Sequence, residues 1–253
     1  MTVHNTPYLP YSFQVSVDIP VPVADPLSLG LPPDAGMGSK IRLSTARGGQ
    51  DTPLARVFAP RSGQPGVRKA PSLFWILDGP SDGRLCSVRP VDRDIHEVYA
   101  ADGTLLATVT RRAGRVVPWP RRVRWSARLT TSPQSVTGKV GTWYSWGVYV
   151  VTSPIWFLYM VFSVLLSHWE GAADDPSFGS PARTCWRVRG NGTALDYRGI
   201  GQKTYHFDPR RLDLRVAYAL AVLRTWEAKD QVMAHLSKRK DKAHGEVGRE
   251  PAS

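Results

Sequence analysis

The residues best suited to chemistry in this 253-residue chain are arginines that lie close together. The stretch from Gly103 to Trp169 has no Asp or Glu, yet it contains eight Lys or Arg side chains. Guanidinium groups bind phosphate and carboxylate through charge-assisted hydrogen bonds, so the stretch predicts an anion-binding surface. A solvated strand face is the alternative interpretation of such a charge run. The candidate anion- or lipid-binding residues are Arg111, Arg112, Arg115, Arg122, Arg124 and Arg128.

Catalytic chemistry is not indicated by the remaining residue patterns. The chain has no G-x-S-x-G sequence, no P-loop and no dinucleotide-binding fingerprint. His96 and His206 lie in predicted strands near the acidic residues Glu97 and Asp208, an ordinary setting for surface or core groups. We therefore expect no enzymatic activity.

The two cysteines, Cys86 and Cys185, lie too far apart and are too few for a disulfide framework. No Cys and His spacing in the chain matches a zinc site, and neither cysteine has an activating neighbour. We expect both to be small buried side chains, with no metal and no cofactor.

A predicted strand over residues 121–129 would position three of the candidate arginines. Successive side chains of a strand point to opposite faces, which here gives one apolar face and one basic face. The apolar face has Val123, Trp125, Ala127 and Leu129, and the basic face has Arg122, Arg124 and Arg128. Nucleic-acid binding is a less favoured alternative, because Trp125 lies opposite the arginines and cannot provide a base-stacking surface beside them.

Antiparallel β-structure is predicted on both sides of this strand. Short apolar runs separated by turn residues recur from residue 40 to residue 113 and again from residue 184 to residue 207. Asp102-Gly103 joins two such runs, and this dipeptide is a strong hairpin signal because it tolerates positive φ. The spacing of the runs favours a sandwich or a barrel.

Val140 to Trp169 form thirty residues without a formally charged side chain. One helix of that length would be about 45 Å long and could cross a bilayer, but Pro154 interrupts it. The first part resembles a strand, and Ile155 to His168 suit an interfacial or buried helix. A single membrane-spanning helix remains the alternative. The candidate membrane-interface residues are Trp143, Trp146, Ile155, Trp156, Phe157, Phe162, Leu165 and Leu166.

The last apolar run, residues 212–223, is apolar on every face of a helix and must therefore be buried. At about 12 residues it is too short to cross a bilayer, so we expect it in the middle of a barrel. The predicted organisation is a proline-rich arm over residues 1–39, a barrel with its central helix over residues 40–226, and a charged tail over residues 227–253. Alternation from Val15 to Val23 also permits an edge strand within the arm.

This order of strands, followed by Leu212-Asp213-Leu214-Arg215 and a wholly apolar helix, resembles the tubby C-terminal-like superfamily, which includes the LURP-one-related and phospholipid scramblase-like domains. The hairpin Val98-Tyr-Ala-Ala-Asp-Gly-Thr-Leu-Leu-Ala-Thr-Val and the following Arg122-Val-Arg-Trp are similar to mid-barrel strands of the same group. The resemblance implies a closed antiparallel β-barrel around a C-terminal hydrophobic helix. It also implies a non-enzymatic role in binding an anionic phospholipid headgroup or membrane surface.

The charge balance agrees with an anionic partner, since 33 Lys and Arg against 21 Asp and Glu give a net charge of +12. A membrane-anchored protein with a structural or partner-docking role is the main alternative function. Residues 1–38 contain no Lys or Arg and are interrupted by prolines, so no export signal is predicted. We expect a cytoplasmic, membrane-associated protein, and an excess of 25 Arg over 8 Lys is typical of a GC-rich bacterial genome.

Overall fold

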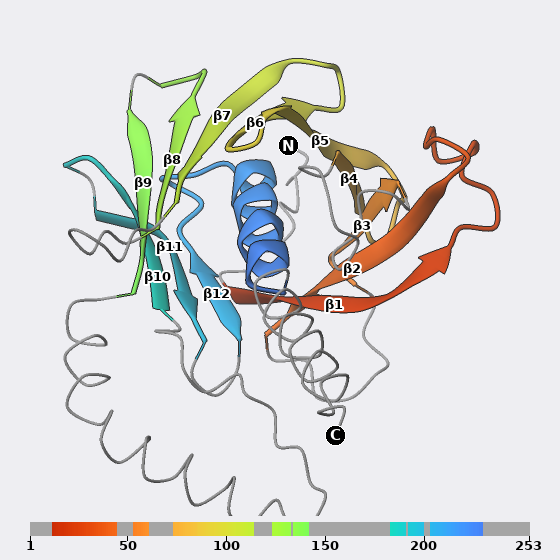
Figure 1. Cartoon of the computed structure of the whole chain (residues 1–253), viewed down its shortest axis with the longest axis horizontal. Helices are drawn as coiled ribbons and strands as arrows, with labels where there is room; N and C mark the ends of the chain where they lie inside the picture. Colours follow the sequence, from red (N-terminus) through yellow and green to blue (C-terminus); the bar gives the residue numbers. More distant parts are fainter. Residues whose placement is uncertain are drawn as a thin grey trace, which may run out of the picture.

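Within the part of the chain that the structure describes, twelve antiparallel strands form a closed barrel around one helix in the computed structural model (Figure 1). The structure describes residues 12–44, 53–60, 73–113, 123–132, 134–141, 183–190, 192–199 and 203–229, apart from the side chains of residues 18–20. The helix, residues 214–229, is here called the central helix. The strands are β1 (Ser12–Pro22), β2 (Ala35–Leu43), β3 (Ala55–Pro60), β4 (Phe74–Asp78), β5 (Arg84–Asp92), β6 (Ile95–Ala100), β7 (Leu105–Arg112), β8 (Arg124–Leu129), β9 (Ser135–Val140), β10 (Arg183–Val188), β11 (Gly192–Arg198) and β12 (Thr204–Phe207).

The strands follow one another around the barrel in chain order, and β1 closes the ring by pairing with both β12 and β2. Each strand therefore has a hydrogen-bonded neighbour on both sides, although β1 pairs with β12 only through Ser12 to Gln14. The predicted fold class, a mainly β protein with a closed antiparallel barrel around a C-terminal hydrophobic helix, is therefore confirmed.

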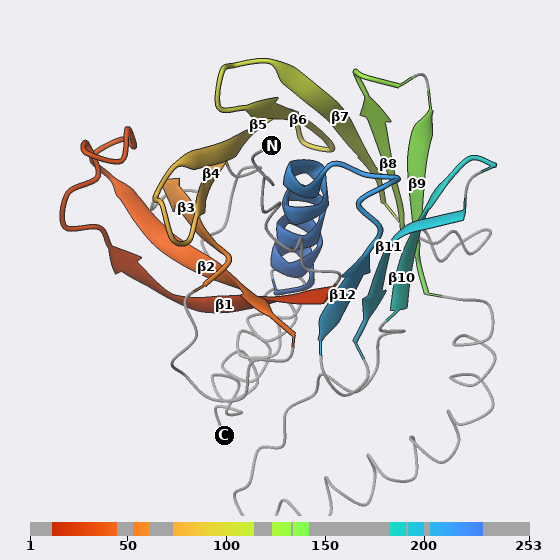
Figure 2. The same cartoon turned by 180° about the vertical axis from the view of Figure 1, so that it is seen from behind.

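The central helix lies inside the ring, with strands on every side of it in both views (Figures 1 and 2). Every residue from Val216 to Leu223 is buried, which explains why the sequence is apolar on all faces of this helix. Polar groups also join the helix to the wall. The Tyr205 hydroxyl donates to the Ala221 carbonyl oxygen at 3.1 Å, and Trp226 Nε1 donates to Ser39 Oγ at 2.8 Å.

The hairpin predicted at Asp102-Gly103 connects β6 to β7. Gly103 has φ of 85°, a conformation that glycine adopts without steric cost, and the Ala100 N–H donates to the Thr104 carbonyl oxygen at 2.8 Å. The Thr104 N–H also donates to Asp102 Oδ1 at 2.9 Å. The local signal and the observed turn agree.

The barrel begins and ends outside the expected residues 40–226. β1 and the start of β2 lie within residues 1–39, where we expected an arm, because strands of a closed barrel need partners on both sides and β1 supplies them for β12 and β2. At the other end, the central helix continues to residue 229, into the expected tail.

The apolar segment Val140 to Trp169 is described only at Val140 and Gly141, so the eight candidate membrane-interface residues lie outside the described residues. The part of the chain that the structure describes contains no helix long and apolar enough to cross a membrane. The Gly141 N–H donates to the Arg183 carbonyl oxygen at 2.7 Å. The chain therefore leaves β9 and re-enters β10 at the same place on the barrel rim.

Candidate anion-binding surface

Three cations form a row across neighbouring strands on the outer wall of the barrel. Arg112 of β7 is the register partner of Arg124 of β8, which is in turn the register partner of Lys139 of β9. All three side chains are exposed. Directly opposed residues in antiparallel strands have Cβ atoms about 4.5–5.5 Å apart, so the three charges lie side by side.

Hydroxyl groups and two further arginines continue this surface toward the other rim. The next outward row is Thr110, Ser126, Thr137 and Arg187, and the one beyond it is Thr108, Arg128 and Ser135. We call the five cations the basic face; they are Arg112, Arg124, Arg128, Lys139 and Arg187. Because hydroxyls separate the rows of cations, the surface offers both charge-assisted and neutral donors to phosphate oxygens.

The basic face has no acidic counterpart in the described residues. None of its five cations forms an ion pair with a described carboxylate. The basic strand face expected from residues 121–129 is therefore observed for Arg124 and Arg128, with Trp125 and Ala127 buried on the inner side. Like charges opposed in this way destabilise a sheet unless an anion lies over them.

Arg111 does not belong to this surface, so the structure does not bring it together with the other predicted anion-binding residues. Its register partner is Trp125, whose side chain is buried, so Arg111 points to the inner side of the wall. There Arg111 Nε donates to Glu227 Oε1 of the central helix at 2.6 Å, and Nη1 donates to Asp94 Oδ1 at 2.8 Å. Burial lowers the pKa of Arg111, but the hydrogen bonds and charges of Glu227 and Asp94 outweigh it and the net direction is upward. Arg111 is a permanently charged link between wall and helix.

Two other predicted anion-binding residues, Arg115 and Arg122, lie outside the described residues. Lys139 and Arg187 were not among the candidates, although both extend the basic face. Lys139 lies inside the acid-free stretch, and alternation over residues 135–139 places it outward opposite the buried Val136 and Gly138. Arg187 has no such signal, because only strand register brings β10 beside β9.

An acidic residue marks the edge of the basic face. Asp196 of β11 accepts from Arg183 Nε at 3.0 Å and Nη2 at 2.9 Å, and from Arg198 Nε at 3.2 Å. Burial raises the pKa of Asp196, but the hydrogen bonds from Arg183, Cys185 and Arg198 prevail and the net direction is downward. These two arginines are thus partly neutralised, unlike those of the basic face.

Cys86, Cys185 and His96 are poorly placed for catalysis. Complete burial raises the pKa of Cys86 to about 12, and burial together with a hydrogen bond to Asp196 raises the pKa of Cys185. His96 is buried inside the barrel, whereas Glu97 points outward and accepts from the Tyr99 hydroxyl, so the two are not paired. No group of three potential metal-ligating side chains occurs among the described residues.

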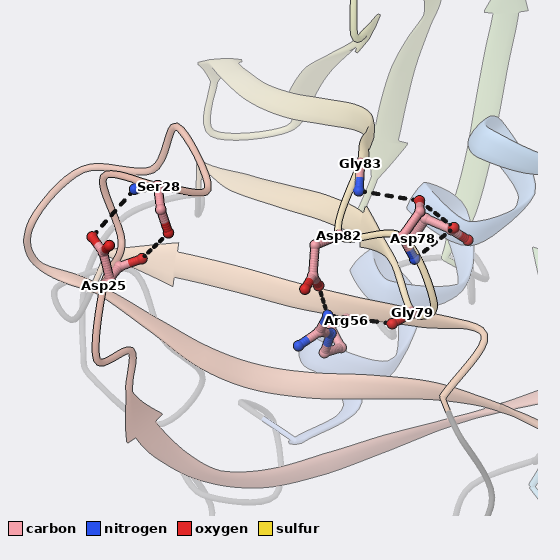
Figure 3. Close-up of polar contacts among 8 residues, drawn as sticks. Asp25, Ser28, Arg56, Asp78, Gly79, Asp82 and Gly83 are labelled. Carbon is pink, nitrogen blue, oxygen red and sulfur yellow. Dashed lines mark hydrogen bonds and ion pairs between the residues drawn. The ribbon is translucent and has the colours of Figure 1, made fainter.

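A second polar region, at the turn between β4 and β5, is already neutralised (Figure 3). Arg56 of β3 pairs with Asp82 and also donates to the Gly79 carbonyl oxygen at 3.3 Å. Asp78 accepts from the Ser81 hydroxyl at 2.6 Å. These charges tie the turn to the wall and leave the basic face as the better candidate site.

Comparisons of the chain with protein-family models, with curated proteins and with solved structures find no match, so the basic face has to be interpreted from its own geometry.

Proposed function

We propose that the protein is a non-enzymatic, tubby-like barrel that binds an anionic membrane surface through the phosphate groups of phospholipid headgroups. The observation that carries this proposal is the row formed by Arg112, Arg124 and Lys139. These three cations are register partners on neighbouring strands, and none of them forms an ion pair with a described carboxylate. An anionic bilayer supplies a plane of phosphates that such a row can meet all at once. The resemblance to tubby C-terminal-like proteins implies the same ligand class.

The apolar segment supports a membrane rather than a soluble anion. Lys139 immediately precedes Val140, the first residue of that segment. The chain leaves the barrel after Gly141 and returns at Arg183, and a hydrogen bond joins these two residues. The candidate interface residues of the segment would then enter the bilayer interface beside the headgroups bound by the basic face. The proposed location is accordingly the cytoplasmic surface of a membrane.

Nucleic acid is the less favoured ligand of the same surface. Trp125 is buried, and no aromatic side chain lies in the outward rows of described β7, β8 and β9 residues. Single-stranded nucleic acid binds by stacking bases on exposed aromatic rings as well as by charge. The basic face therefore offers it electrostatic attraction alone.

The test measures partitioning of the full chain onto phosphatidylcholine vesicles with and without phosphatidylserine, at fixed salt. The test variant replaces Arg112, Arg124 and Lys139 by Gln. A control variant with the same charge replaces the exposed residues Arg89, Arg93 and Arg210 by Gln. Each cation near an anionic surface contributes about 1 kcal/mol, so the test variant should partition roughly 100-fold more weakly. Equal partitioning of the two variants would show that the basic face does not bind the vesicles.

Two additions to the same assay separate the alternatives. An oligonucleotide that displaces the protein from vesicles at equal phosphate concentration would favour nucleic acid as the ligand. A carbonate wash that fails to release the protein from cell membranes would favour the membrane-anchored alternative, in which residues 140–169 are inserted. We expect carbonate to release the protein from membranes, and we expect its binding to vesicles to depend on the basic face.

A further inference from the structure

A separate cationic hollow lies on the outer wall where β12, β1 and β2 meet. It has a volume of about 330 Å³ and is lined by Gln14, Val15, Ser16, Arg42 and Lys203. Ligand pockets span about 300–1,000 Å³, so this hollow suits a small group rather than a large molecule. One strand, β11, lies between β12 of this hollow and β10, which carries Arg187 of the basic face.

Strand register explains why these side chains converge. Gln14 of β1 is opposed by Arg42 of β2 on one side and by Thr204 of β12 on the other, and Lys203 immediately precedes Thr204. Phe13 is buried inside the barrel. Gln14, Arg42 and Thr204 therefore share the outer face of the wall.

The cations in this hollow have no acidic partner among the described residues. Neither Arg42 nor Lys203 forms an ion pair with a described carboxylate. Arg42 is half-buried, and its Nε atom is buried with no hydrogen-bond partner. A buried charged donor without an acceptor is unfavourable. A turn of the Arg42 side chain toward an oxyanion in the hollow would give this Nε–H an acceptor.

Hydrogen bonds hold the other lining groups in position. Gln14 Nε2 donates to Thr204 Oγ1 at 3.4 Å, which leaves the second N–H of that amide without a described acceptor. Ser44 Oγ lies 3.3 Å from the same Thr204 oxygen, and Ser16 Oγ donates to the Lys40 carbonyl oxygen at 3.3 Å. The Gln14 amide thus leaves one neutral N–H donor beside the two charges of the hollow.

A second hollow, of about 300 Å³ at the mouth of the barrel, provides a contrast. Two of the three arginines that line it are neutralised, because Arg211 pairs with Asp208 at 2.8 Å and Arg215 pairs with Asp213 at 2.7 Å. An anion there would compete with carboxylates that are already bound. The Arg42 hollow has no such competition among the described residues.

We propose that Arg42 and Lys203 bind a phosphomonoester group in this hollow. Such a group carries a charge close to −2 at neutral pH, which matches two unpaired cations. The planar guanidinium of Arg42 can donate from Nε and one Nη to two phosphate oxygens, while Lys203 acts as a point charge on the group. The site does not depend on the basic face, so either proposal can fail alone.

The experiment measures binding of inorganic phosphate to the full chain by titration calorimetry at constant ionic strength. We expect Arg42→Gln and Arg42→Lys each to raise the dissociation constant at least tenfold, since Lys keeps the charge but loses the Nε donor. Lys203→Gln, an exposed position that folding tolerates, should raise it at least threefold. Arg93→Gln, an exposed arginine on the β5–β6 turn, is the matched control and should leave it within twofold.

A vesicle arm distinguishes a lipid source from a free phosphate compound. The chain with Gln at positions 112, 124 and 139 is mixed with phosphatidylcholine vesicles that contain phosphatidic acid, a phosphomonoester lipid, or phosphatidylglycerol, a phosphodiester lipid. A preference for phosphatidic acid that Arg42→Gln abolishes assigns the hollow to a lipid headgroup. Binding of inorganic phosphate alone, with the same dependence on Arg42, assigns it to a soluble phosphate compound. If Arg42→Gln changes neither measurement, the proposal is overturned.

Discussion

Arg111→Gln is the substitution that best tests how the wall of the barrel is joined to its central helix. Arg111 contacts Glu227 Oε1 through Nε at 2.6 Å and through Nη2 at 2.5 Å, and Asp94 Oδ1 through Nη1 at 2.8 Å. Glutamine keeps a polar side chain but cannot span both carboxylates. The substitution should therefore lower the free energy of unfolding without changing the exposed surface.

Burial sets the size of the effect. The side chains of Arg111, Glu227 and Asp94 are 23%, 13% and 40% exposed, so the cluster lies between a surface pair and a fully buried one. Surface pairs contribute about 0.2–1 kcal/mol, and removing one partner of a buried pair costs about 3–5 kcal/mol. We expect Arg111→Gln to cost about 2–3 kcal/mol, most of it from leaving Glu227 with one cation fewer.

Urea denaturation followed by tryptophan fluorescence measures this loss, and Arg112→Gln is its control. Arg112 is the next residue of the same strand but is exposed on the outer wall, so its replacement should change stability by no more than about 0.5 kcal/mol. A double-mutant cycle with Glu227→Gln should give a coupling energy of at least about 1 kcal/mol. If Arg111→Gln and Arg112→Gln destabilise equally, or if the cycle shows no coupling, the link between wall and helix is not what stabilises this part of the barrel.

Three further substitutions test the core. Gly138→Ala should cost about 1–3 kcal/mol in urea denaturation, because its Cβ would lie 2.4 Å from Trp186 Nε1, and an unchanged midpoint would mean that the indole moves away freely. Burial lowers the pKa of His96 in the folded chain below its ordinary 6.5. The unfolded chain therefore takes up this proton first as the pH drops, and the free energy of unfolding falls below pH 6.5. His96→Gln should remove that part of the pH dependence, and an unaltered slope of stability against pH would contradict this. Trp226→Phe should cost about 1–2 kcal/mol by removing the bond to the buried Ser39 hydroxyl, and an unchanged thermal midpoint would argue against it.

Much of the fold follows from local patterns. Alternation over residues 124–129, the Asp102-Gly103 turn and the all-apolar helix each predict a local structure that the barrel contains. Local patterns do not predict the closure of the ring, because closure pairs Gln14 of β1 with Thr204 of β12, 190 residues away. Only long-range register gives the N-terminal residues a partner, and without that partner a proline-rich sequence resembles an unstructured arm.

The basic face shows the same division between local and long-range information. Period-2 alternation predicts Arg124 and Arg128 outward because their strand neighbours are apolar. The same rule places Arg111 on the inner side with Val109, so the sequence contained the signal that separates Arg111 from Arg112. Alternation could not predict that Arg187 joins the basic face. Its position there depends on the pairing of β10 with β9 across a connection of more than forty residues.

The two sides of the barrel wall near β7 and β8 suggest why stability and binding are separable in this protein. On the inner side, Arg111 is satisfied by two carboxylates and contributes to folding whether or not a ligand is present. On the outer side, Arg112 opposes Arg124 and gains nothing from its neighbours in the free protein, where like charges cost a few tenths of a kcal/mol per pair. A bound anion removes that repulsion and stabilises only the folded chain, because the row of cations exists only when the strands are in register. Vesicles that contain phosphatidylserine, a phosphodiester lipid, should therefore raise the thermal midpoint of the natural sequence and leave that of the Arg112, Arg124 and Lys139 variant unchanged.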